Sequence, residues 1–164
     1  MPRKRVESQG RSLLRHTVAT LAYRGSKALR GAPDKFEQFR AGASTRTPAQ
    51  ILAHIGDLLD WALSLAKGKQ KWHNSRPVSW GEGSKRFFAA LQAFDLYLAS
   101  DKPLRCPAEK LFQGPVADAL THVGQISMLR RIAGGPVRGE NYLQAAIAVG
   151  VVGAKQAPAK FEFD

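Results

Sequence analysis

Four segments of the chain repeat apolar residues at steps of three and four, the spacing that places them on one face of an α-helix. No segment shows a convincing alternation of apolar and polar residues, which a half-buried strand would require. The sequence therefore predicts an all-α fold: a four-helix bundle with a long crossover through residues 31–46 after the first helix, and a C-terminal extension. The four predicted helices cover residues 12–29, 48–67, 80–100 and 115–133.

Residues that favour helix ends support these boundaries. Thr47 with Gln50 and Ser79 with Glu82 have the spacing of a capping box, in which each side chain bonds the other's backbone N–H. Pro115 follows a glycine and suits a first helical position, so we expect the fourth helix to start there. A Gly-Gly-Pro run at residues 134–136 ends it.

The predicted organisation is a basic, flexible N-terminus at residues 1–11, a helical domain at 12–153 and a tail at 154–164. One cysteine, Cys106, excludes an internal disulfide framework and fits a reducing compartment. No apolar run resembles a secretory signal or approaches the roughly 18 residues of a membrane span. We therefore expect a cytoplasmic protein without membrane contact.

The formal net charge of +12 is concentrated near the start of the chain, where residues 1–46 hold eleven Lys/Arg residues against three Asp/Glu residues. A basic segment can bind nucleic acid by counterion release. We favour a solvated basic surface, because no pattern of stacking aromatic residues accompanies the charge.

The predicted fourth helix carries an unusual pair. Between residues 115 and 129 it has one formal charge, Asp118, and one histidine, His122, four residues apart. A helix that is apolar nearly all round is a buried helix, so we expect both side chains inside the bundle. A buried carboxylate needs a cation or several hydrogen bonds, and residues four apart can converge on one ion.

His54 is the best candidate for a third ligand, because it follows Ile51 by three residues on the apolar face of the second helix. Two histidines and one carboxylate with open coordination positions suit zinc, nickel or ferrous iron. The alternative is a hydrogen-bonded Asp118–His122 pair without a metal. Gln125 continues the same helix line toward the C-terminal end. His16 on the first helix is a further pocket candidate, for which we favour a structural role.

The stretches TPAQILAHIGDLLDWAL and ADALTHVGQISMLRRIAGGPV resemble the second and fourth helices of the DinB-like superfamily, small four-helix-bundle proteins of bacteria. The resemblance extends over residues 12–136. His54, Asp57 and His122 match the family's first histidine, the acidic residue after it, and the later histidine of a pair. Asp118 stands where the family has the earlier histidine of that pair, and a carboxylate is also able to ligate a metal.

The resemblance implies a divalent metal in an open cleft, often a homodimer, and in some relatives a thiol-dependent transferase or isomerase activity. If the site is catalytic, Asp57 is a candidate to orient His54 by a hydrogen bond, the alternative being that it faces solvent three residues further along the helix. Three hypotheses follow: a metal-dependent transferase or hydrolase acting on a small molecule, a non-catalytic dimeric ligand-binding or interaction module with a degenerate metal site, and a nucleic-acid-associated protein.

Overall fold

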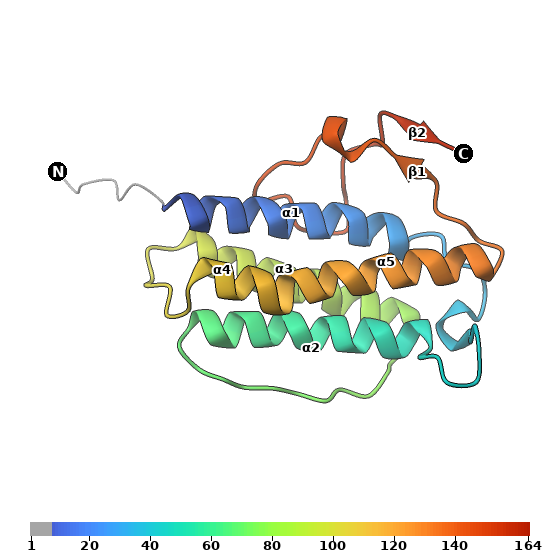
Figure 1. Ribbon diagram of the computed structural model, residues 1–164, viewed down its shortest axis with the longest axis horizontal. Coiled ribbons are helices and arrows are strands. Elements are labelled where there is room, and N and C mark those ends of the chain that lie inside the picture. Colours follow the sequence, from blue (N-terminus) through green and yellow to red (C-terminus); the bar gives the residue numbers. More distant parts are fainter. Residues whose placement is uncertain (1–7) are drawn as a thin grey trace.

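The computed structural model describes residues 8–164, and helices dominate this part of the chain (Figure 1). The prediction of an all-α fold is confirmed. No helix within the described residues is both long and apolar enough to cross a lipid bilayer. The helices are α1 (Gln9–Leu29), α2 (Pro48–Ala66), α3 (Trp80–Ala99), α4 (Ala108–Leu111) and α5 (Ala117–Ile132), with a 3-10 turn at Phe36–Gln38 between α1 and α2.

Both predicted capping boxes are present. The Thr47 hydroxyl accepts from the Gln50 backbone N–H, and the Gln50 side chain accepts from the Thr47 N–H at 2.9 Å. Ser79 and Glu82 make the same exchange at the start of α3. The first helix begins at Gln9, so its first residues belong to the segment expected to be a flexible N-terminus, of which residues 1–7 lie outside the described part.

The predicted start of the fourth helix is wrong. The helical path begins at Ala108, after Pro107, and reaches α5 through a π-helical turn at Phe112–Val116 that contains Pro115. Proline has no N–H to donate and its ring crowds the preceding turn, and the wider π turn accommodates both effects. The end of α5 is as predicted, with Gly134 in the left-handed conformation at φ 82°.

The helices bury one shared apolar core. Helix α2 packs against α3 and α5, and α1 packs against the same two helices (Figure 1). Each helix turns its apolar stripe inward, which removes that surface from water and drives the packing. Fully buried side chains from all four long helices meet there, among them Val18, Leu21, Ile55, Leu59, Phe87, Phe94 and Ile126.

The C-terminal segment contains a small sheet that the sequence pattern does not predict. Strand β1 (Gly139–Glu140) pairs antiparallel with β2 (Glu162–Phe163), and each strand is too short to show an alternation. Lys27 on α1 donates to both strand glutamates, to Glu140 at 2.9 Å and to Glu162 at 2.8 Å. The segment expected to be a tail is therefore held against α1.

Candidate metal centre

His54 comes from α2, and Asp118 and His122 come from α5, the helix packed beside it. One ligand atom from each of the three lies within 4.8 Å of the other two. The Asp118 oxygens are 3.7 Å from His54 Nε2 and 3.4 Å from His122 Nε2. Atoms bound to one zinc-like ion at about 2.1 Å lie roughly 3.4 Å apart in tetrahedral geometry. The group could therefore hold a metal ion, as the sequence pattern predicts.

Gln125 orients one of the histidines. Its side-chain oxygen lies 2.7 Å from His122 Nδ1. Because an amide oxygen only accepts, Nδ1 is the donor in this contact, and Nε2 is the ring nitrogen that faces Asp118. Metal-bound histidines in proteins commonly have such a partner on the other ring nitrogen. Gln125, a residue proposed for the site from the sequence, thus lies in contact with His122.

The surroundings of His54 favour its neutral form. Burial lowers the pKa of the His54 imidazole below its usual value, and the nearby His122 ring and Arg46 charge lower it further, against the opposing effect of Asp118. A neutral imidazole is the form that ligates metals. His54 is thus prepared to donate a lone pair at neutral pH.

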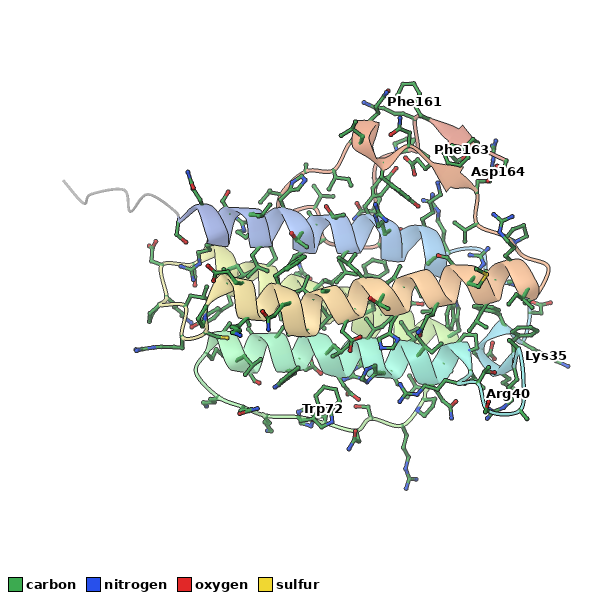
Figure 2. The ribbon with its side chains drawn as sticks, viewed as in Figure 1. Lys35, Arg40, Trp72, Phe161, Phe163 and Asp164 are labelled. Carbon is green, nitrogen blue, oxygen red and sulfur yellow. The ribbon has the colours of Figure 1, made fainter. Side chains whose placement is uncertain are left out.

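An aromatic residue from a distant segment covers one side of His54. Trp72 lies in the loop at residues 67–79, which Figure 2 shows running alongside α2. The Trp72 ring meets His54 edge to face with centroids 5.7 Å apart, and the His122 ring also meets His54 edge to face, at 4.7 Å. The sequence offers no signal for the placement of Trp72, because the contact depends on the path of a loop.

The expectation that the Asp118 side chain lies buried inside the bundle is wrong. The side chain of Asp118 is 48% exposed, and Met128, further along α5, is also exposed. Helix α5 packs against α1 and α2, and its remaining side faces outward. This side of α5, although it carries few charges, therefore lies at the surface beside an open pocket and not within the core.

That opening is a pocket of about 580 Å³ between α2 and α5. Its volume falls within the roughly 300–1,000 Å³ typical of small-molecule sites. It is lined by both histidines and Gln125, by the apolar side chains of Ile51, Met128 and Leu129, and by Thr45 and Arg46 from the segment before α2. Sequence reasoning missed Arg46, whose only signal is its position directly before the α2 cap.

Two other predicted site residues lie elsewhere. Asp57 is buried, but it accepts hydrogen bonds from Ser75 and Arg86 and does not contact His54 as an orienting partner. His16 is exposed on α1 and is not among the residues lining the pocket. The ligand group that could hold a metal ion thus consists of His54, Asp118 and His122, with Gln125 in contact with His122.

Comparison of the chain with protein-family models, with curated proteins and with solved structures finds no match. The DinB-like resemblance stays a prediction drawn from the two helix motifs.

Proposed function

We propose that the chain is a DinB-like four-helix bundle, with a long crossover between its first two helices, that binds a divalent metal ion through His54, Asp118 and His122. The observation that carries the proposal is the convergence of three electron-pair donors from two helices at the edge of an open pocket. Two imidazoles and one carboxylate are a donor set suited to zinc, nickel or ferrous iron.

The pocket supports a metal-dependent transferase or hydrolase acting on a small molecule. A divalent metal with an open coordination position lowers the pKa of a bound water or thiol and polarises an electrophile. The chain's own residues supply the rest: Gln125 holds the His122 tautomer, and Trp72 covers one side of His54. The apolar walls provide a surface for a substrate beside the ligand group.

Metal content of protein purified without an affinity tag tests the proposal. We expect about one equivalent of a transition metal after incubation with zinc, nickel or ferrous iron followed by dialysis. His54→Ala, Asp118→Ala and His122→Ala should each lose it, and Gln125→Ala should weaken metal affinity by about 10- to 100-fold.

His16→Ala is the matched control, because it removes an exposed histidine outside the pocket. This variant should retain the metal at the level of the parent chain. An unmetallated parent after all three incubations would refute the proposal, as would equal metal retention in the three ligand variants.

A further inference from the structure

The pocket extends well beyond the ligand group. From His122 to Leu129 its α5 wall runs for seven residues, or about 10 Å of helix. Ile51 on α2 and Met128 on α5 add apolar surface to this part. A molecule that reaches the ligand group would therefore lay an apolar portion along the two helices.

Arg46 lines this same pocket and, unlike Arg86 and Arg130, is not engaged by the described part of the fold itself. Arg86 pairs with two carboxylates, and Arg130 donates to four backbone carbonyls. Within residues 8–164, Arg46 takes part in no ion pair, and none of the residues that line the pocket is acidic. Its guanidinium is available to a ligand.

Arg46 lines the same pocket as His54 and His122, so a ligand in this pocket lies between its guanidinium and the two histidines. Arginine presents a planar fork of donors that matches the oxygens of a carboxylate or phosphate. The pocket thus combines a cation, an apolar wall and a group of potential metal ligands.

We propose that this pocket binds a small organic anion with an apolar body, its anionic group on Arg46 and its body along Ile51, Met128 and Leu129. This placement directs the opposite end of the molecule toward His54 and His122. The reaction of that end rests on the proposed metal function, whereas recognition by Arg46 does not require the metal.

Octanoate is a suitable probe, since it joins one carboxylate to a flexible apolar chain. Its binding is measured by NMR titration of the ¹⁵N-labelled full chain at low ionic strength, where screening is weakest. We expect shifts at the pocket residues, and Arg46→Gln should weaken binding about five- to tenfold, the loss of a charge-assisted contact at a solvent-exposed site. Lys85→Gln removes an exposed cation of α3 that lines none of the described pockets, and should leave binding unchanged.

Two comparisons identify what is recognised. Octanol shares the chain but lacks the charge, so it should bind more weakly and respond little to Arg46→Gln. Octyl phosphate distinguishes a phosphate from a carboxylate ligand, and either anion supports the proposal if Arg46→Gln weakens it. Octanol binding as tightly as both anions would overturn the proposal, as would the absence of binding by both.

The Asp118→Ala variant, which removes one proposed metal ligand but no residue that lines the pocket, separates this inference from the metal proposal. If octanoate binding and its dependence on Arg46 persist in that variant, the anion site stands whatever the metal content of the parent. If octanoate binds only the metal-loaded parent and Arg46→Gln has no effect, the carboxylate sits on the metal. That result overturns the inference and leaves the proposed function intact.

Discussion

Helix α2 contributes one residue to each of two polar groups, His54 to the first and Asp57, three residues later, to the second. The partners in the two groups are chemically opposite. His54 meets Asp118 and His122, so every member of that group offers lone pairs. Asp57 meets Arg86, whose Nη2 lies 2.7 Å from an Asp57 oxygen, so the second group contains its own cation. The second group contains both charges of its ion pair, whereas the first group could hold a bound cation.

The two groups are nevertheless connected through the loop at residues 67–79. Asp57 accepts from the backbone N–H and the hydroxyl of Ser75, at 2.9 and 2.6 Å, which fixes this loop to α2. The same loop places Trp72 against His54. A residue that does not touch the candidate metal centre therefore helps to hold one of its walls.

The largest expected effect comes from removing Arg86, the cation that pairs with Asp57 in the second group. Arg86→Met keeps much of the apolar stem but leaves Asp57, 3% exposed, without its cation. Removing one partner of a buried pair typically costs about 3–5 kcal/mol, and we expect a value near the lower end, about 3, because Arg86 is itself partly exposed. Urea unfolding measures it, with Lys85→Met as the control on α3. A loss below about 1 kcal/mol would show that the Asp57–Arg86 pair contributes little to stability.

The next effect tests whether a metal ion stabilises the chain by binding to the first group, His54 with Asp118 and His122. A metal that binds only the folded chain raises the free energy of unfolding by about 2.7 kcal/mol at a concentration 100 times its Kd. We expect this gain for the parent chain and for Lys85→Met, but none for Asp118→Ala. Equal stabilisation of Asp118→Ala by the metal would show that the ion binds elsewhere.

The comparison also shows where prediction from the sequence succeeds. Local signals are sufficient for the helices, because a capping box such as Thr47 with Gln50 acts within one turn. The spacing of Asp118 and His122 likewise brings the two together on any regular helix. His54 joined them because its apolar stripe faces the same neighbouring helix.

The remaining features depend on contacts between distant segments. Arg86 lies 29 residues from Asp57, and no local pattern assigns one to the other. The exposure of Asp118 follows from which helices flank α5, and the role of Pro115 follows from a π turn that has no simple sequence signal. The expected contact of Asp57 with His54 is therefore absent, and Asp57 pairs with Arg86 instead.

Gly56 offers a change confined to the second group. A Cβ at this position would lie 2.7 Å from Cζ of Arg86, so Gly56→Ala must shift the guanidinium that pairs with Asp57. We expect a net loss of no more than about 2 kcal/mol in urea unfolding, since overpacking costs about 1–3 kcal/mol and alanine regains about 1 kcal/mol through helix propensity. The metal content should remain that of the parent chain. A stabilised Gly56→Ala protein would show that Arg86 moves aside at little cost.

The acid stability of the chain should reflect Asp57. Burial raises the pKa of this carboxyl, but the hydrogen bonds from Ser75 and Arg86 outweigh it and hold the pKa below its usual value. Such a group stabilises the fold above its unfolded pKa of about 3.9, and that contribution is lost as the pH falls through the lower folded value. In urea unfolding between about pH 5 and pH 2, Asp57→Asn should lose less stability than the parent. Identical slopes for the two proteins would place the acid sensitivity in other carboxylates.

The smallest expected loss of stability is for Asp60, the most exposed of the side chains that pair with Arg86 in the second group. Its oxygen lies 2.9 Å from the same Arg86 nitrogen that Asp57 engages, yet its side chain is 40% exposed and water competes for the contact. Asp60→Asn should therefore cost less than about 1 kcal/mol in urea unfolding, the range of surface ion pairs. A loss as large as that of Arg86→Met would mean that the arginine depends on both carboxylates together. A small loss would leave Asp57 as the main partner of Arg86. Asp57 also bonds Ser75, and so it holds the loop that brings Trp72 to the candidate metal centre.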